Sequence, residues 1–86
     1  MARVVLARRA RDDLLDLDWP LIDAGEEALG LLEREPTVGY ALRGRLHGVR
    51  SLRVGAYRIL YQLIDGQNVR VAAIRHRSTA YRADPR

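Results

Sequence analysis

Three short β-like runs follow one another in the second half of this chain, with only turns between them. They cover residues 49–54 (VRSLRV), 57–64 (YRILYQLI) and 69–77 (VRVAAIRHR), and branched apolar residues recur in each. The sequence DGQN between the last two runs is a strong turn signal. Runs joined by turns this short pair as antiparallel neighbours. The sequence therefore predicts a three-stranded antiparallel sheet.

The first half of the chain predicts one strand and two helices. Residues 2–7 (ARVVLA) are short, apolar and β-branched, as in an opening strand, and residues 8–18 place leucines at helical spacing. A second helix begins after Asp18, which can cap it, and ends before Pro36. The two helices form a hairpin packed on one face of the sheet, so the predicted fold is a single α+β domain over residues 1–86.

The two halves of the chain carry opposite charge. Residues 1–42 hold five arginines and nine acidic residues, a net charge of −4, whereas residues 43–86 hold ten arginines and two aspartates, a net charge of +8. Every basic residue is an arginine, which a GC-rich genome would also produce, so the clustering is more informative than the choice of residue. A basic second half predicts an anionic partner, with nucleic acid first.

Several kinds of chemistry are excluded by composition. The chain has no cysteine, and its two histidines lie far apart without clustered carboxylates, so we expect no disulfide, no metal site and no cofactor. There is no glycine-rich phosphate loop, nucleophile elbow or dinucleotide fingerprint. No signal peptide and no apolar stretch of ~20 residues is present, which predicts a soluble cytoplasmic protein.

The DGQN turn decides which residues face each other across the last two runs. If Gly66 and Gln67 are the central turn residues and pairing continues without a break, Arg58 faces Arg75. Like charges placed opposite one another destabilise a sheet, so an anion between the two guanidinium groups would explain the pair. Arg77 shares their face because side chains alternate along a strand. The alternative is that these arginines only solvate an open sheet face.

The same pairing divides the remaining hairpin residues between two faces. The face that carries Arg58 is predicted to include Leu60, Gln62, Ile64, Val69, Val71 and Ala73. The other face is predicted to form the core beneath the helices, with Tyr57, Ile59, Tyr61, Leu63, Ala72 and Ile74. The first face is too apolar for a surface that meets only water, so we expect a partner segment to cover part of it.

The candidates for chemistry lie near the end of the chain, in IRHRSTAYR. His76 titrates near neutrality and is the candidate general acid or base, but strand alternation places it on the core face, where a half-buried ring is the simpler expectation. Tyr81 follows the strand and either stacks on a base or anchors the chain end against the sheet. His47 is expected to be a loop residue.

The region from Leu42 to Arg82 resembles the RelE/ParE superfamily of bacterial type II toxins. The specific parts are SLRVGAYRILY, in which a Tyr-Arg step leads into an apolar strand, and the closing His-Arg followed by a tyrosine. The resemblance implies a small toxin that a cognate antitoxin inactivates by wrapping around it in a hetero-oligomer. In the RelE branch it implies a metal-independent endoribonuclease that cleaves mRNA on the ribosome, by attack of a ribose 2′-hydroxyl on the adjacent phosphate, and so inhibits translation.

The resemblance also implies roles for single residues. Arg58 matches the arginine that stabilises charge on the phosphate, and Tyr81 matches the tyrosine that orients the substrate. The second phosphate arginine is Arg75 by counting back from Tyr81, or Arg77 by matching the Ile-x-His-Arg ending, and His76 is left to move protons. Five other arginines of the basic half are predicted to bind RNA: Arg43, Arg45, Arg50, Arg53 and Arg82.

One departure from the RelE branch keeps other functions open. The lysines that some RelE-type nucleases carry on the second strand are replaced by Val49 and Ser51, and arginine does not serve as a base near neutral pH. A ParE-like poison of DNA gyrase, which needs no catalytic base, is therefore the alternative function. A decayed toxin that acts only as a binding module is the third. The Arg-His-Arg ending followed by tyrosine favours the nuclease.

Overall fold

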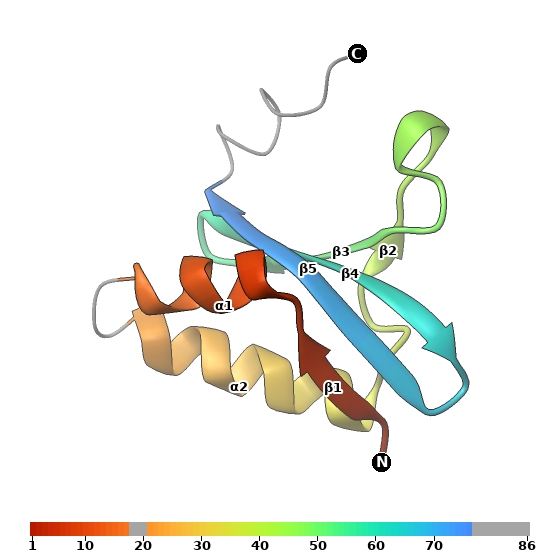
Figure 1. The fold of residues 1–86 in the computed structure, drawn as a ribbon, viewed down its shortest axis with the longest axis horizontal. Helices are drawn as coiled ribbons and strands as arrows, with labels where there is room; N and C mark the ends of the chain where they lie inside the picture. Colours follow the sequence, from red (N-terminus) through yellow and green to blue (C-terminus); the bar gives the residue numbers. More distant parts are fainter. Residues whose placement is uncertain (18–20, 77–86) are drawn as a thin grey trace.

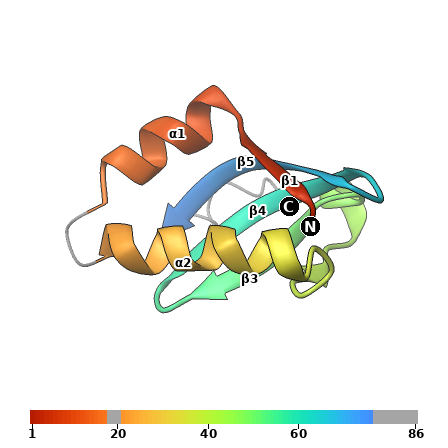
Figure 2. The same cartoon turned by 90° about the horizontal axis from the view of Figure 1, so that it is seen from below.

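The computed structural model describes residues 1–17 and 21–76, which form a twisted β-sheet with two helices on one side (Figures 1 and 2). In chain order the elements are β1 (Arg3–Leu6), α1 (Arg8–Leu15), α2 (Leu21–Arg34), β2 (Tyr40–Ala41), a short 3-10 helix η1 (Gly44–Leu46), β3 (Arg50–Val54), β4 (Tyr57–Asp65) and β5 (Asn68–His76). The predicted α+β class, opening strand, pair of helices and antiparallel meander are confirmed.

The sheet has five strands, whereas the sequence predicted three. Its order is β1-β5-β4-β3-β2, with β1 parallel to β5 and every other pair antiparallel. The sequence predicted the strand β1 but not its place at the edge of the sheet, beside β5 (Figure 1). β2 has only two residues, Tyr40 and Ala41, opposite Ser51 and Arg50. Two residues are too few for an alternating pattern, so the sequence holds no signal for this strand.

Two one-residue bulges in the β4–β5 hairpin change the predicted pairing. Asp65 faces Asn68 at the turn and Arg58 faces Arg75, both as predicted. Between these two points the register shifts beside Leu63, and it shifts again between Leu60 and Tyr61. The first shift leaves residue 64 of β4 without a partner and the second leaves residue 72 of β5 without one. Because the extra residues lie on opposite strands, the second bulge restores the register.

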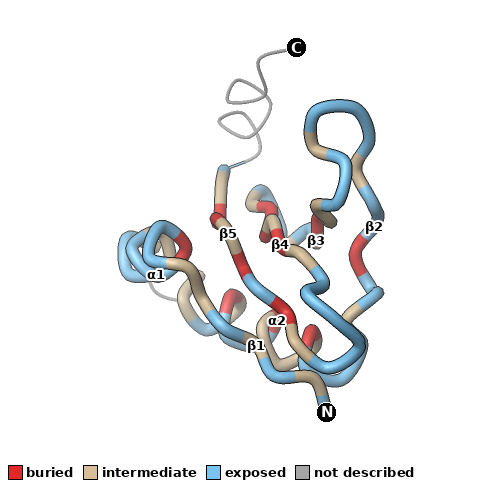
Figure 3. Tube along the Cα trace, turned by 45° about the vertical axis from the view of Figure 1, so that its right-hand side comes forward, coloured by how far each residue is buried: buried red, intermediate tan, exposed pale blue. Residues whose placement is uncertain are grey.

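The bulges bring two valines into the core that the sequence placed on the open face. Val69 and Val71 are 1% and 0% exposed and pack in one cluster with Ile59 and Tyr61. The helices contribute Ala10, Ala28 and Leu32 to this cluster. Figure 3 shows how buried segments recur along β4 and β5. The prediction that Val69 and Val71 share a face with the arginines was therefore wrong.

The same shift changes two residues that were predicted to be core. Leu63 is 37% exposed, because it lies near the end of the sheet, and Ala72 is only partly buried at its bulge. Of the other apolar residues predicted for the open face, Leu60 and the buried Ala73 remain beside the arginines, and Ile64 is 58% exposed at its bulge. The open face is thus less apolar than predicted, so the expectation that a partner must cover it loses most of its support.

A carboxylate on α1 occupies the outer edge of β5 where β1 no longer covers it. β1 pairs only as far as Val71. Further along, the backbone N–H of Ile74 donates to Oδ2 of Asp13 at 2.9 Å, and Nε of Arg9 donates to Oδ1 of the same carboxylate at 3.2 Å. Asp13 therefore satisfies a strand N–H at an edge that no described strand covers, and it holds α1 against the sheet.

Removing this carboxylate is expected to destabilise the fold. Ile74 is 6% exposed, so Asp13→Ala leaves its N–H almost buried without an acceptor. Hydrogen bonds to charged groups contribute roughly 1.5–3 kcal/mol, and we expect the free energy of unfolding in urea to fall by about 2 kcal/mol. The exposed neighbour is the matched control, and Asp12→Ala should change stability by less than about 0.5 kcal/mol. Equal losses in the two variants would contradict this role of Asp13.

Asp65 closes the turn between β4 and β5. Its Oδ1 accepts from the backbone N–H of Gln67 at 2.8 Å and from Nδ2 of Asn68 at 3.0 Å. The Gln67 backbone N–H lowers the pKa of Asp65 most, followed by the Asn68 side chain. A lowered pKa means that this contribution to stability is present above the ordinary aspartate pKa and is lost as the pH falls through the lowered value.

Candidate anion-binding site

Three arginines lie in a row across the face of the sheet opposite the helices. Strand pairing puts Arg53 of β3 opposite Arg58 of β4, and Arg58 opposite Arg75 of β5. Residues directly opposite in antiparallel strands point to the same face, with Cβ atoms roughly 5 Å apart. The sequence predicted the pair Arg58 and Arg75, and the structure extends it to a third strand. We call these three residues the arginine row.

Arg58 is the buried centre of the arginine row. It is 8% exposed, and its Nη1 donates to the hydroxyl of Tyr40 and, at 3.4 Å, to Oγ of Ser51. Like charges directly opposite one another destabilise a sheet, and the row places three guanidinium groups side by side. An anion bound across the row would offset their mutual repulsion, which makes this face a candidate site for phosphate.

The two outer arginines lack carboxylate partners in the described part of the chain. Arg53 is exposed and Arg75 is half-buried, and Nε of Arg75 is buried without a hydrogen-bond partner among residues 1–17 and 21–76. The one salt bridge between described residues joins Arg9 to Asp13 on α1 and includes no member of the row. The outer members of the row therefore present positive charge that described side chains do not neutralise.

Two residues beside the row, Tyr40 and Ser51, were missed by the sequence analysis as site residues. They face each other across β2 and β3, and Ser51 in turn faces Leu60, so they lie on the same face as Arg58. Tyr40 is 54% exposed and Ser51 is 1% exposed. Tyr40 precedes Arg58 by 18 positions on a two-residue strand, and no sequence signal joins them.

The position of Arg53 in the row had a sequence signal. Val54 faces Tyr57, so Gly55 and Ala56 form a two-residue turn, with Gly55 at a φ of 60°. A two-residue turn at this glycine places Arg53 opposite Arg58 by counting alone. The same counting that paired Arg58 with Arg75 would have found the whole row.

His76 lies on the other face of the sheet, at the end of β5. It faces Tyr57, and the two rings are nearly perpendicular, with centroids 5.2 Å apart and an interplanar angle of 89°. The predicted face is confirmed, but the predicted half-burial is wrong, since His76 is exposed where the strand ends. The described geometry thus does not bring His76 into the arginine row.

The other predicted site residues are scattered. Arg43 and Arg45 are exposed in the loop around η1, as is His47, the predicted loop residue. The predictions for three further residues fall outside the described part of the chain: Arg77, Tyr81 and Arg82.

Arg50 has a structural role that the sequence did not indicate. It faces Tyr61, on the helix side of the sheet, and so lies on the opposite face from the arginine row. Its Nε and Nη2 donate to the carbonyl oxygen of Gly39 at 3.0 and 2.6 Å, and Nη2 also donates to the carbonyl of Thr37 at 3.0 Å. The structure therefore does not join Arg50 to the other predicted RNA-binding arginines.

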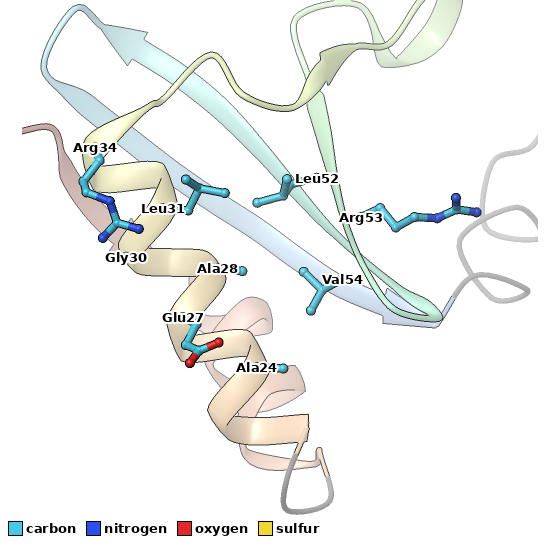
Figure 4. A pocket seen from close by; sticks show the side chains of 9 residues that line it. All are labelled: Ala24, Glu27, Ala28, Gly30, Leu31, Arg34, Leu52, Arg53 and Val54. Atoms are coloured by element: carbon cyan, nitrogen blue, oxygen red, sulfur yellow. The ribbon is translucent and has the colours of Figure 1, made fainter.

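A groove runs between α2 and β3, and Arg53 links it to the arginine row. It has a volume of about 580 Å³. Figure 4 shows Leu52 and Val54 of β3 pointing toward Ala28 and Leu31 of α2, while Arg53 between them points away. The apolar walls end at two charged helix residues: Glu27 and Arg34.

The edge of β3 beside this groove is open beyond Ser51. On its outer side β3 pairs only through Arg50 and Ser51. The N–H of Leu42 donates to the carbonyl of Val49 at 2.9 Å, and backbone groups of alternate residues point to the same side of a strand. The N–H and C=O of Arg53 therefore also point outward, where no strand of the described chain pairs with them.

The described residues provide neither a metal cluster nor a membrane span. No three His, Cys, Asp or Glu side chains in residues 1–17 and 21–76 come together as a potential metal site. Neither of the two described helices is long and apolar enough to cross a membrane.

Known proteins resemble this chain in sequence, in fold or in both. The sequence model for the ParE toxin of the type II toxin-antitoxin system parDE matches residues 4–81. Toxin RelG of Mycobacterium tuberculosis is 44% identical over 77 residues, which cover 85% of this chain and 87% of the relative. The RelBE2 toxin-antitoxin complex from the same organism contains a chain with a TM-score of 0.81 and 39% identity, and the match covers 88% of this chain and 98% of that chain. The isolated RelE toxin of E. coli has the same fold, with a TM-score of 0.73, 18% identity and 96% of each chain covered.

Proposed function

Because this chain belongs to the ParE toxin family of type II toxin-antitoxin systems and is RelE-like, we propose that it is a ribosome-dependent endoribonuclease that cleaves mRNA in the cytoplasm. The observation that carries the proposal is the arginine row, with Arg58 buried at its centre and Arg53 and Arg75 on either side. A row of guanidinium groups on an open sheet face suits a polyanion better than a neutral or cationic substrate.

The proposed reaction is transesterification within the message. A ribose 2′-oxygen loses its proton and bonds to the adjacent phosphorus, the bond from phosphorus to the 5′-oxygen breaks, and that oxygen takes up a proton. The products are a 2′,3′-cyclic phosphate and a 5′-hydroxyl. Negative charge builds on the phosphate oxygens in the transition state, where Arg58 and Arg75 stabilise it electrostatically. Removal of one such donor typically costs about 100- to 1,000-fold in rate.

Proton transfer in this reaction needs a residue other than the three arginines of the row. His76 is our candidate proton carrier because an imidazole can both accept and donate a proton, and because this residue is exposed next to Arg75 in the chain. Its ring lies on the opposite face from Arg58, so the ribosome and the bound message must supply much of the positioning. Arg77 as the alternative second arginine, and Tyr81 as the residue that orients a base, remain predictions.

A cell-free translation reaction tests the proposal directly. We would add the purified chain, map the message by primer extension, and use ribosome-free RNA as the control and the cognate antitoxin as competitor. Breaks at codon spacing, seen only with ribosomes and suppressed by the antitoxin, are expected. An intact message under these conditions would refute the nuclease.

A gyrase poison is the second candidate function, and one observation favours it. The separation of His76 from the arginine row leaves the described site with cations for binding but no base beside them. A binding function on this surface needs no base. Gyrase-dependent DNA breaks in cells that express the chain, together with an intact message, would support it. A decayed toxin that acts only as a binding module would cause no growth arrest at all.

The groove between α2 and β3 suits the antitoxin partner that this family implies. An extended antitoxin segment can pair with the outward N–H and C=O of Arg53 and so add a strand to the open edge of β3. Apolar side chains of that segment would enter the groove between Leu31 and Leu52, and an acidic one would meet Arg34 or Arg53. The proposed complex is a toxin-antitoxin hetero-oligomer.

A leucine on the groove wall tests this docking mode. Leu31 lines the groove and is not part of the buried core cluster, so Leu31→Glu should fold but place an unpaired charge against the antitoxin. We expect the dissociation constant for the antitoxin to rise at least tenfold, or about 1.4 kcal/mol. The matched control is Leu15→Glu at the end of α1, where the leucine is 71% exposed. Equal affinities for the two variants in calorimetric titration would place the antitoxin elsewhere.

A further inference from the structure

Tyr40 reaches Arg58 because only the small side chain of Ser51 lies between them on this face of the sheet. Tyr40 and Ser51 are directly opposite on β2 and β3, and Ser51 adjoins Arg58 on the same face of the sheet. The serine side chain is small and fully packed, at 1% exposed. A tyrosine on the outermost strand can therefore extend its ring over Ser51 to the centre of the arginine row.

The contacts of Tyr40 with Arg58 are of two kinds. Nη1 of Arg58 donates to the Tyr40 hydroxyl, with Oγ of Ser51 3.4 Å from the same nitrogen. The guanidinium carbon also lies 5.9 Å from the centre of the Tyr40 ring, within the range of a cation–π contact. Tyr40 and Ser51 thus hold one nitrogen of the guanidinium from one side, which fixes the rotation of the whole planar group.

The backbone before Tyr40 is held in place by long-range bonds. The N–H of Gly39 donates to Oη of Tyr61 at 2.9 Å, and the carbonyl of Gly39 accepts from Nε and Nη2 of Arg50 at 3.0 and 2.6 Å. Tyr61 is 0% exposed, so this support is anchored in the core. A two-residue strand at the sheet edge would otherwise be a loose support for a site residue.

We propose that Tyr40 is a positioning residue for the phosphate site, which sets the orientation of the Arg58 guanidinium before the anion arrives. The inference rests on the proposed nuclease function and adds to it a residue that the sequence did not indicate. A guanidinium that is already fixed in one orientation loses no rotational freedom when phosphate binds. It also stabilises the transition state without having to rearrange. The exposure of Tyr40 agrees with this role, because the residue is 54% exposed and lies beside a buried cation.

Tyr40→Phe isolates the hydroxyl, because the ring and its cation–π contact remain. In the full-length chain we would record the side-chain nitrogen and proton NMR signals of Arg58, without anion and with inorganic phosphate. The wild type should show separate, slowly exchanging Nη signals, and the variant should show merged ones together with about fivefold weaker phosphate binding. Identical Arg58 signals in the two proteins would overturn the proposal. This readout needs no catalytic activity, so it holds even if the wild type proves not to be a nuclease.

Cleavage on ribosomes supplies the second readout. If the wild type cuts, Tyr40→Phe should lower kcat about tenfold and leave KM within about twofold, whereas an unchanged kcat would overturn the proposal. The control is Ala41→Ser, on the same short strand but facing Arg50 on the other side of the sheet, and it should behave as wild type. If Ala41→Ser lost as much activity as Tyr40→Phe, the effect would come from β2 as a whole, and Tyr40 would have no positioning role of its own.

Discussion

Gly39→Ala is expected to lower the free energy of unfolding by about 3 kcal/mol and to disable the arginine site. A Cβ at this position would lie 2.6 Å from the carbonyl oxygen of Ser51 and 2.8 Å from Oη of Tyr61. Both distances are shorter than real contacts allow, and one of the two atoms belongs to the backbone of β3, so β2 itself must move. Overpacking costs roughly 1–3 kcal/mol. Loss of the bond from the Gly39 N–H to Tyr61 adds about 1 kcal/mol.

The loss of function follows from the same displacement. If β2 moves away from β3, the hydroxyl of Tyr40 leaves Arg58. Urea denaturation and the ribosome cleavage reaction would measure the two effects. Gly30→Ala in α2 is the matched control, because its Cβ would meet only Nη1 of Arg34, at 3.6 Å, and a helical alanine is more stable than glycine by about 0.5–1 kcal/mol. A stable, active Gly39→Ala variant would show that β2 tolerates the added methyl group.

The parts of the fold that could be predicted from the sequence are those with a local cause. The DGQN turn was found from its residue types, and the structure shows how Asp65 closes it. The pairing of Arg58 with Arg75 followed by counting from that turn. The bulge at residue 64 and the bulge at residue 72 have no such local cause. They allow Val69 and Val71 to face the helices, and this requirement of the core is visible only when the elements are packed.

The residues of the candidate site also divide into those with a local sequence signal and those without one. Arg58, Arg75 and Arg53 all lie at positions that turn chemistry and strand alternation place on one face. Tyr40 does not, because its strand depends on pairing with β3 and on the preceding Gly39, whose N–H donates to Tyr61 and whose carbonyl accepts from Arg50. The sequence also could not show that Arg50 binds backbone carbonyls on the helix side. Arginine alone does not distinguish an anion ligand from a structural clamp, and only its face and its acceptors do.

Arg58→Ala is expected to lower mRNA cleavage by at least about 100-fold, equivalent to about 2.7 kcal/mol of transition-state stabilisation. Arg58 is the one member of the row that is buried and held on one side by both Tyr40 and Ser51, so no neighbour can take its place. Arg58→Lys keeps the charge but not the planar fork, and we expect it to lose more than about tenfold, since bidentate phosphate binding needs the fork. Growth arrest in cells should disappear with cleavage.

A second arginine on the same sheet face as Arg58, but outside the arginine row, tests whether positive charge on that face is by itself sufficient for cleavage. Arg70 faces Gln62 near the other end of the hairpin and is exposed, so Arg70→Ala removes the same charge from the same sheet outside the row. It should cleave within about threefold of wild type. Arg58→Ala and Arg70→Ala should both keep the antitoxin affinity, because neither residue lines the groove between α2 and β3. If Arg58→Ala folds, binds the antitoxin and still cleaves the message as wild type does, then the arginine row is not the phosphate site.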